Sequence, residues 1–385
     1  MSTVQPHITL AADLATIPTP RVVVERTRLD ANIAAMQARA NAAGVRLRPH
    51  TKTHKSPAIA RQQLDAGAVG ICCAKLGEAE VMAAAGIRDI RLPYPVQPSN
   101  AGRVIALLDA GTRVSIIVDD LAVARGWSTA MTAAGRVLDV LVKVDVGTHR
   151  CGVDPASPGT LDAIATIAAL PGLRFRGLLS HAGHAYGAAS EAEIGDVAEA
   201  EIRIHRTLRD TLAARGVAVD EISVGSTPSA RCIGDQPGVT EMRPGNYVFF
   251  DRTQVGLGST PLDGCALTIL STVVSRPAPD RVVFDAGSKA LTSDGVRGFD
   301  RPVGHGLVFP GLDMTRPDDE IVIERLSEEH GVARLPPDRT LRPGDRVRII
   351  PNHACVVVNL TDELIVADGR EIAARLPVAA RGRTW

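Results

Sequence analysis

The sequence predicts an α/β protein in which a (β/α)₈ TIM barrel is followed by an all-β domain. Short β-branched runs alternate with Ala-rich amphipathic stretches through the first part of the chain. Beyond residue 255 the runs become short and β-rich, with Pro- and Gly-containing turns and no helical period. A chain of 385 residues with 45% hydrophobic and 22% charged residues can bury the core that both units need. We therefore assign residues 18–255 to the barrel and residues 256–385 to the β domain.

The barrel assignment depends on eight short apolar runs separated by helical stretches. The expected strands are 22–24, 45–48, 69–73, 90–93, 114–118, 137–144, 174–179 and 221–224. The expected helices are 29–43, 57–66, 76–85, 101–110, 121–134, 160–169 and 191–215. Alternation of this kind implies parallel strands joined by right-handed crossovers. Eight such units in about 240 residues fit a closed barrel better than an open sheet.

The second domain is expected to contain strands but few helices. Its predicted strands are 265–274, 281–284, 320–324, 346–350, 356–360 and 363–366. The opening segment, within residues 1–17, precedes the first strand and is expected to pack on this domain.

Composition excludes several classes of protein. The 43 basic and 43 acidic residues cancel, so there is no basic field to hold nucleic acid or an anionic membrane. Six scattered cysteines are too few for a disulfide framework and are interpreted as reduced. The N-terminus lacks a signal-peptide pattern, and no apolar run reaches the roughly 18 residues of a membrane span. We expect a cytoplasmic protein with a small-molecule substrate.

Four polar clusters follow predicted barrel strands. They lie at residues 50–55, 145–150, 180–186 and 225–228. Active sites of such barrels form at the carboxyl ends of the strands, so these clusters are expected to meet at one rim.

Lys52 is the first candidate catalytic residue. It is one of only five lysines among 43 basic residues, and it follows the second predicted strand. Its sequence neighbours Arg48, His50, His54 and Lys55 are cationic or titratable, and positive charge nearby favours the neutral amine that forms a Schiff base. The alternatives are a rim lysine beside structural histidines, or a metal-dependent hydrolase that uses His50 and His54.

The segment Gly225-Ser226-Thr227 follows the eighth predicted strand. Backbone N–H groups and two hydroxyls at this place suit a phosphate group, although an ordinary capped turn has the same composition. Together with Lys52 the segment suggests pyridoxal phosphate, whose aldehyde needs a lysine and whose phosphate needs such a loop.

His353 and Cys355 are candidate metal ligands. Residues two apart on a strand share one face, and imidazole with thiolate favours Zn²⁺. The alternative is a core cysteine beside a hydrogen-bonded histidine. Glu329-His330-Gly331 is a further polar interruption that we expect near this pair.

Five motifs in this order resemble the D-serine dehydratase and D-threonine aldolase family, which consists of fold-type III, alanine-racemase-like pyridoxal phosphate enzymes. The resemblance covers the chain from about residue 18, and its motifs are Arg-Pro-His-Thr-Lys-Thr-His-Lys (48–55), Ser-Val-Gly-Ser-Thr-Pro-Ser (223–229), Arg-Pro-Gly-Asn-Tyr-Val-Phe-Phe-Asp (243–251), Glu-His-Gly (329–331) and Pro-Asn-His-Ala-Cys (351–355).

The resemblance implies a role for each candidate residue. Lys52 and His181 would be catalytic, and Lys52 would carry the cofactor. Arg150 would lie near the ring hydroxyl, and His181 and Tyr186 would line the pocket. His353 and Cys355 would bind a divalent metal, with zinc favoured over manganese or magnesium. The phosphate would be held by Gly225, Ser226, Thr227, Gly245, Asn246 and Tyr247. A homodimer is also implied, in which the β domain of one chain closes the barrel mouth of the other.

The implied activity is that of a lyase on D-β-hydroxy-α-amino acids. Dehydration of D-serine, D-threonine or 3-hydroxy-D-aspartate to a keto acid and ammonia is favoured, because dehydratase-like members share the His-x-Cys pattern. Aldolases of the family carry Asp in the place of Cys355, so cleavage to glycine and an aldehyde is the alternative. More remote are a non-catalytic carrier of the cofactor and a racemase, which needs a second base; all three tyrosines, Tyr94, Tyr186 and Tyr247, lie in the barrel part.

Overall fold

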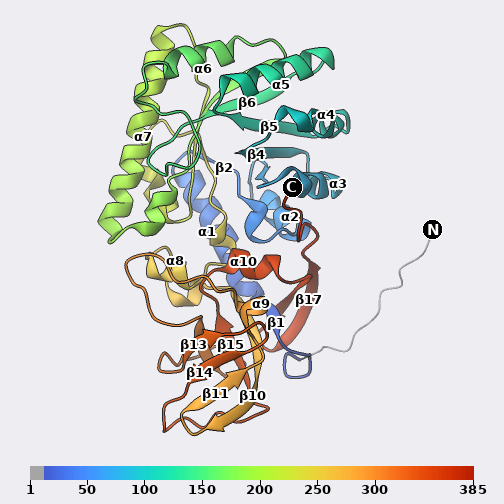
Figure 1. Cartoon of the computed structure of the whole chain (residues 1–385), viewed down its shortest axis with the longest axis vertical. Coiled ribbons are helices and arrows are strands. Elements are labelled where there is room, and N and C mark those ends of the chain that lie inside the picture. The colour runs from blue at the N-terminus through green and yellow to red at the C-terminus, as the bar shows by residue number, and fades with distance from the viewer. Residues whose placement is uncertain (1–12) are drawn as a thin grey trace, which may run out of the picture.

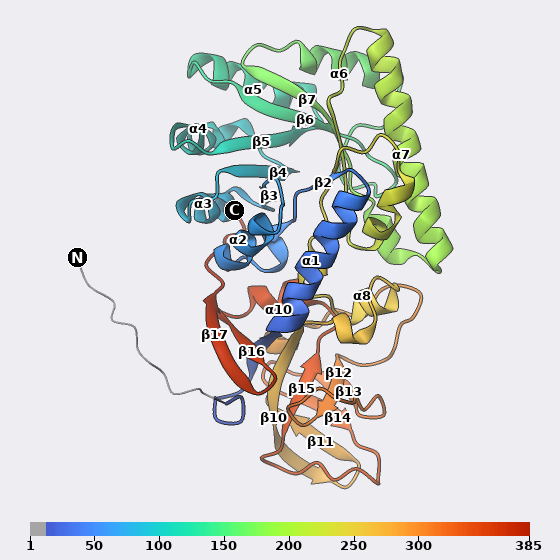
Figure 2. The ribbon, with the colours of Figure 1, turned by 180° about the vertical axis from the view of Figure 1, so that it is seen from behind.

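The computed structural model describes residues 13–385, which form a barrel and a second, β-rich unit. The barrel and its outer helices occupy the upper part of Figure 1, and the second sheet lies below them. Helix α1 (Arg26–Ala42) runs across the junction of the two units, as the view from behind shows (Figure 2). None of the helices in this described part is both long and apolar enough to cross a lipid bilayer.

The barrel contains eight parallel strands in the order β2-β9-β8-β7-β6-β5-β4-β3. It closes between β2 and β3, where the Cys72 amide donates to the Pro49 carbonyl at 2.8 Å and the Val69 amide donates to the Leu47 carbonyl at 2.9 Å. The predicted barrel class is therefore confirmed. The strands are β2 (Arg46–Leu47), β3 (Ile71–Cys72), β4 (Asp89–Pro95), β5 (Arg113–Val118), β6 (Leu138–Lys143), β7 (Leu173–Leu179), β8 (Glu221–Val224) and β9 (Glu241–Met242).

One member of the predicted set of eight strands is wrong. The run 22–24 does form a strand, β1 (Arg21–Glu25), but β1 pairs with β10 and β16 of the second sheet. The eighth barrel strand is instead β9, which pairs with β2 and β8. A strand of two residues is too short to show the alternation from which strands are predicted.

Helices cover the outside of the barrel, and the seven predicted helical stretches are confirmed with small changes at their ends. Side-chain caps start several of them: the Asp120 carboxylate accepts from the Val123 amide at 2.9 Å, and the Ser190 hydroxyl accepts from the Glu193 amide at 3.2 Å. The helices after α1 are α2 (Pro57–Asp65), α3 (Leu76–Ala84), α4 (Ala101–Asp109), α5 (Leu121–Ala133), α6 (Thr160–Ala168) and α7 (Glu191–Ala214). The short helix α8 (Arg252–Gly256) follows the last barrel strand and lies next to the second unit (Figure 1).

A buried network of charges fills the barrel interior around Glu241 of β9. Its carboxylate accepts from Arg48 Nε at 2.7 Å, from Arg91 Nη1, and from the Ser223 hydroxyl at 2.6 Å. Burial alone would raise the pKa of the Glu241 carboxyl, but the charges of Arg91 and Arg48 lower it to about 2. Arg91 also donates to Glu221 of β8 at 2.8 Å. The network therefore connects β4, β8, β9 and the end of β2 inside the barrel.

The second sheet contains nine strands, and its longest, β10, pairs with β1, β11 and β15. Three of its strands, β12, β14 and β17, had not been predicted. The strands besides β1 are β10 (Leu267–Ala278), β11 (Arg281–Phe284), β12 (Leu307–Pro310), β13 (Val322–Leu326), β14 (Gly331–Arg334), β15 (Arg346–Ile350), β16 (Glu363–Asp368) and β17 (Glu371–Pro377).

The strand predicted at 356–360 is wrong, because this segment belongs to helix α10 (Ala354–Asn359). A run of three valines has high β-propensity, but tertiary packing overrides it here. Ala354, Val357 and Val358 are fully buried, and their spacing of three and four residues is that of a helix face. The other helix of this unit is α9 (Ser288–Leu291), which lies beside α10 (Figure 1).

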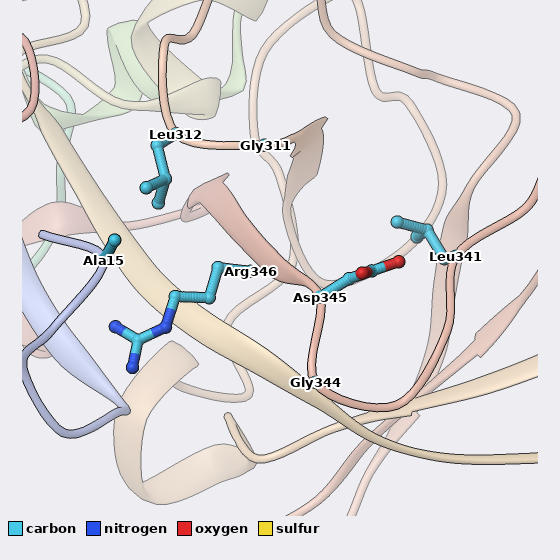
Figure 3. A pocket seen from close by; sticks show the side chains of 7 residues that line it. All are labelled: Ala15, Gly311, Leu312, Leu341, Gly344, Asp345 and Arg346. Carbon is cyan, nitrogen blue, oxygen red and sulfur yellow. The ribbon is translucent and has the colours of Figure 1, made fainter.

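The chain enters the second sheet before it reaches the barrel. Leu14 and Ile17 pack with Val23 and Leu270, and Arg346 donates to the carbonyls of Leu14 and Ile17 at 2.7 Å. Figure 3 shows the Arg346 side chain directed toward this segment, beside an open depression of about 500 Å³. The expected packing of residues 1–12 lies outside the described residues. Residues 13–25, including the segment 18–25 that was assigned to the barrel, contribute to the second sheet.

The Glu241 network predicts a large loss of stability on substitution. Glu241→Gln leaves Arg48 and Arg91 buried without a full counter-charge, so we expect the free energy of unfolding in urea at pH 7 to fall by about 3–5 kcal/mol. Glu324→Gln, in an exposed pair with Arg334, is the control and should change it by less than about 1 kcal/mol. The pKa of Glu241 in the folded protein lies below its ordinary value. The Glu241 carboxylate therefore contributes fully to the free energy of unfolding above about pH 4.5, and this contribution disappears as the pH falls toward 2. Equal effects of both substitutions would contradict the prediction.

Candidate active site

A cavity of about 530 Å³ lies where the carboxyl ends of the barrel strands meet the second unit. Ten of the twelve predicted site residues line it, and they come from both units of one chain. These ten are Lys52, Arg150, His181, Tyr186, Ser226, Thr227, Gly245, Asn246, His353 and Cys355. The four polar clusters after the barrel strands therefore do meet at one rim.

Lys52 belongs to a 3₁₀ turn, Thr51–Thr53, that directly follows β2. The turn is capped by His50, whose Nδ1 accepts from the Lys52 amide at 3.3 Å. Thr53 Oγ1 lies 3.3 Å from the sulfur of Cys355, which comes from the second unit. The loop therefore holds Lys52 within the cavity and, one residue later, contacts the candidate metal ligands.

The expected cationic surroundings of Lys52 are only partly correct. His50 lines the cavity, but Arg48 is bound to Glu241 and Asp89 in the barrel interior, and Lys55 Nζ donates to the Ala380 carbonyl. The spatial neighbours that the sequence did not suggest are Lys143 and Arg243, which line the same cavity.

His54 is fully buried away from the cavity. Its Nδ1 accepts from the Ser56 amide, and its Nε2 contacts Gln63 at 3.2 Å. Since only His50 of the pair lines the cavity, the hydrolase in which both histidines bind one metal is wrong.

His181 is held as a neutral imidazole in a fixed tautomer. Its Nδ1 donates to the Gly225 carbonyl at 2.5 Å, which leaves Nε2 as an acceptor. Burial, followed by the positive charges of Lys52 and Lys143, keeps the pKa of His181 well below its ordinary value. The side chain can accept a proton or a hydrogen bond at Nε2 but carries no charge itself at neutral pH.

Two loops interlock to form a cradle beside Lys52. The Asn246 amide donates to Thr227 Oγ1 at 3.1 Å, and the hydroxyls of Ser226 and Ser229 are 2.8 Å apart. A Cβ at Gly225 would lie 3.1 Å from the Arg243 backbone, so the close approach of the loops favours glycine there. A Cβ at Gly245 would meet the His50 carbonyl at the same distance. Hydroxyl and backbone groups on an otherwise cationic wall suit a phosphate group.

Gly225 and Tyr247 are the two predicted site residues that do not line the cavity. Gly225 contributes its carbonyl to His181, as described above. The Tyr247 side chain is fully buried, and its hydroxyl accepts from Gln63 Nε2 at 2.8 Å. Burial raises the pKa of this phenol, so Tyr247 is a neutral core residue in this structure.

His353 and Cys355 meet in the cavity, although not on a strand as predicted. His353 is the N-cap of α10, and Cys355 is the second residue of that helix. Burial alone would raise the pKa of the Cys355 thiol, but its hydrogen bond to His353 lowers it below the ordinary value. Burial would likewise lower the pKa of His353, but the hydrogen bond to Cys355 raises it to about 10. Once both have lost their protons, an imidazole and a thiolate form a donor set that suits a zinc-like cation.

His353 and Cys355 provide only two protein ligands for a metal ion. Between residues 13 and 385, no group of three or more His, Cys, Asp or Glu side chains is arranged to hold one ion. A cation at His353 and Cys355 would therefore keep positions for water or substrate. Glu329 and His330, which we expected nearby, lie at the turn between β13 and β14 and do not line the cavity.

Two aspartates that the sequence did not single out hold this region together. Asp251 is fully buried, and its carboxylate accepts from Asn246 Nδ2 at 2.6 Å and from the Ala354 amide at 2.9 Å. It thus joins the cradle to the start of α10. Asp294 contacts His353 Nδ1 at 2.6 Å, an arrangement that orients a histidine ligand. Asp251 is the last residue of the motif at 243–251, whereas Asp294 lies in a loop whose sequence shows no recognisable motif.

Lys143 was also missed, although it ends β6 at the rim where catalytic residues are expected. Its side chain is only 4% exposed, and it lines the cavity beside Arg150 and Arg243. Burial, followed by the charge of Arg243, lowers the pKa of the Lys143 amine to about 7. The Lys143 amine, which is partly neutral at physiological pH, therefore faces the same cavity as Lys52.

Comparison with known families identifies both units. Residues 24–253 match the family model for the N-terminal domain of alanine racemase, and residues 266–367 match the model for a putative serine dehydratase domain.

Individual relatives match over nearly the whole chain. A D-threonine aldolase from Arthrobacter sp. is 35% identical over 96% of this chain and 94% of its own length. A D-threo-3-hydroxyaspartate dehydratase from Delftia sp. is 34% identical over 97% of both chains. The solved structure of a variant of D-threo-3-hydroxyaspartate dehydratase in the metal-free form superposes with a TM-score of 0.89, at 33% identity, over 95% of this chain and 98% of the other.

The burial of Lys143 gives a prediction about stability and pH. Because its folded pKa of about 7 lies below the ordinary 10.5, the unfolded chain binds more protons between these values, and stability should rise with pH there. Lys143→Met should therefore stabilise the cofactor-free protein by roughly 2–5 kcal/mol at pH 6, with the gain disappearing near pH 10.5.

Urea unfolding at several pH values measures this effect. Lys289→Met, at an exposed position of the second unit, controls for the loss of one lysine charge. A gain that does not depend on pH would mean that the Lys143 amine keeps its ordinary pKa in the folded protein.

Proposed function

The chain belongs to the D-serine dehydratase and D-threonine aldolase family of fold-type III pyridoxal phosphate enzymes, and on this basis we propose that it is a lyase for D-β-hydroxy-α-amino acids that requires a divalent metal. We propose dehydration to a keto acid and ammonia as its main reaction. The pyridoxal phosphate would be carried by Lys52, and His353 with Cys355 would bind the metal, with zinc as the preferred ion.

One observation carries this proposal: the contact of 3.3 Å between Thr53 and Cys355. It brings the lysine loop of the barrel and the thiolate of the second unit into one cavity. The amine and the two metal donors can therefore act on neighbouring atoms of one small substrate.

The residues that line the cavity have different roles, which follow from their positions. When bound, pyridoxal phosphate would draw electrons from Cα of the substrate, and the metal would polarise the β-hydroxyl. Ser226, Thr227 and Asn246 would hold the phosphate, and Arg150 would lie near the ring hydroxyl. Lys52 offers the amine that removes the proton from Cα. The neutral His181 offers an acceptor at Nε2, and Tyr186 fills the wall next to Thr227.

The atom that loses its proton decides the products. If Lys52 takes the proton from Cα, hydroxide leaves Cβ, and hydrolysis of the product yields a keto acid and ammonia. If a base takes the proton of the β-hydroxyl, the bond between Cα and Cβ breaks and yields glycine and an aldehyde. Cys355 supports the first reaction because the dehydratase-like members have His-x-Cys at the metal. The similarity to a D-threonine aldolase supports the second as the alternative.

The proposed homodimer is compatible with this site. The second unit of the same chain supplies Cys355 and His353 to the cavity. A partner chain would close the remaining opening, as the resemblance implies. A cytoplasmic location also remains a prediction.

Replacement of Lys52 tests the attachment of the cofactor. Lys52→Ala should remove the visible absorbance of a pyridoxal Schiff base and lower turnover by roughly 10²–10⁴-fold or more, because the amine both carries the cofactor and moves a proton. Borohydride should fix the cofactor to the wild-type chain at Lys52, which peptide mapping detects. Lys289→Ala is the control for loss of a lysine, and cofactor bound elsewhere would refute the assignment.

Incubation with D-threonine tests the reaction and the role of the metal. We expect 2-oxobutanoate and ammonia, and we expect a chelator to stop their release without removing the visible absorbance of the cofactor. His353→Ala should behave like the chelated enzyme, whereas His330→Ala, outside the cavity, should retain activity. Glycine with acetaldehyde would establish the aldolase alternative, and full activity without metal would refute the metal site.

A further inference from the structure

We infer that Arg297 selects substrates whose β-carbon carries a carboxylate, so that a β-hydroxy dicarboxylic D-amino acid is preferred over D-serine or D-threonine. The inference rests on the proposed function, because it uses the position of the β-hydroxyl at His353 and Cys355. It concerns the third substituent of Cβ, which that function leaves open.

The part of the cavity wall that comes from the second unit is the place where this substituent must lie. If the hydroxyl on Cβ points to His353 and Cys355, the other group on Cβ lies beside it and can reach this wall. The wall consists of Gly295, Arg297, His353, Cys355, Val356 and Asn359. Of these described residues, only Arg297 has a side chain with a permanent positive charge.

The carboxylates around the wall are already engaged by other groups. Asp294 contacts His353, and Asp251 accepts from Asn246 and the Ala354 amide. In the described part of the chain, the guanidinium of Arg297 has neither a hydrogen bond nor an ion pair, and the side chain is exposed where it lines the cavity. An arginine without a counter-ion in a cavity is a ready partner for a carboxylate, with which it can form two parallel hydrogen bonds.

The Arg297 side chain is exposed, but the backbone of its loop is attached on both sides. Before it, the Asp294 carbonyl accepts from Asn352 Nδ2 at 3.0 Å. At the residue itself, the Arg297 amide donates to Thr253 Oγ1 at 3.3 Å. After it, the Asp300 amide donates to the Gly256 carbonyl at 3.2 Å. These contacts fix the backbone of Arg297 against α8, whose residue Thr253 also lines the cavity.

The other anionic groups expected in the cavity have cations elsewhere. Lys143, Arg150 and Arg243 come from the barrel and also line the cavity. They are available to the α-carboxylate and to the cofactor. Among the lining residues in the part of the chain that the structure describes, Asp251 is the only acidic one, so a second carboxylate on the substrate also balances the charge of the cavity.

Substrate comparison in the holoenzyme tests the inference. Wild type should favour D-threo-3-hydroxyaspartate over D-threonine in kcat/KM, releasing oxaloacetate and ammonia from the dicarboxylate. Arg297→Gln should lower kcat/KM for the dicarboxylate by roughly 10- to 100-fold and leave that for D-threonine within roughly 3-fold. Arg325→Gln, which removes an exposed charge of the same unit outside the cavity, should change neither.

Binding of amino acids that lack the β-hydroxyl gives a second measurement, independent of turnover. D-aspartate and D-alanine differ only by the distal carboxylate, so Arg297→Gln should weaken binding of D-aspartate alone in a calorimetric titration. Equally weaker binding of both ligands would mean that Arg297 binds the α-carboxylate. Unchanged binding of both would mean that Arg297 does not contact the ligand. Both results overturn the inference while leaving the lyase assignment in place, whereas a wild-type enzyme that turns over neither D-threonine nor the dicarboxylate would overturn the proposed function itself.

Discussion

The pairing of Glu241 with Arg48 and Arg91 inside the barrel is the interaction on which the rest of the structure depends. It holds β9 between β8 and β2, although β9 has only two residues and little backbone pairing of its own. The chain that leaves β9 immediately forms Arg243, Gly245 and Asn246 on the cavity wall. A buried carboxylate needs its cations nearby, so the charge network determines where this wall lies.

The second constraint is the close connection between the barrel and the second unit at the cavity. Asp251 bonds to Asn246 on the cradle side and to Ala354 at the start of α10, so one buried carboxylate positions groups from both. Thr53 and Cys355 meet directly. The distance between the lysine loop and the metal donors is therefore determined by packed and hydrogen-bonded groups. This arrangement keeps a small site assembled without a rigid covalent link.

Most of the candidate site could be predicted from the sequence because its residues stand at strand ends or in short motifs. Lys52, His181, Ser226 and Thr227 follow barrel strands and line the cavity. Lys143 also ends a strand, but its burial and its altered pKa depend on neighbours from other strands. Asp294 and Arg297 could not be predicted, because they lie in a loop whose position is set by contacts to Asn352 and Thr253 far along the chain.

The sequence by itself determined the class of fold, the existence of a second β-rich unit and the residue types that carry the chemistry. Periodicity and position at the end of a strand are local properties, so they can be recognised in the sequence without knowledge of the fold. Only the tertiary structure decided that β1 belongs to the second sheet, that β9 completes the barrel, and that the valine run after His353 is helical. Each of these outcomes depends on which distant surface buries an apolar face or pairs a buried charge, and that information is not contained in any short segment.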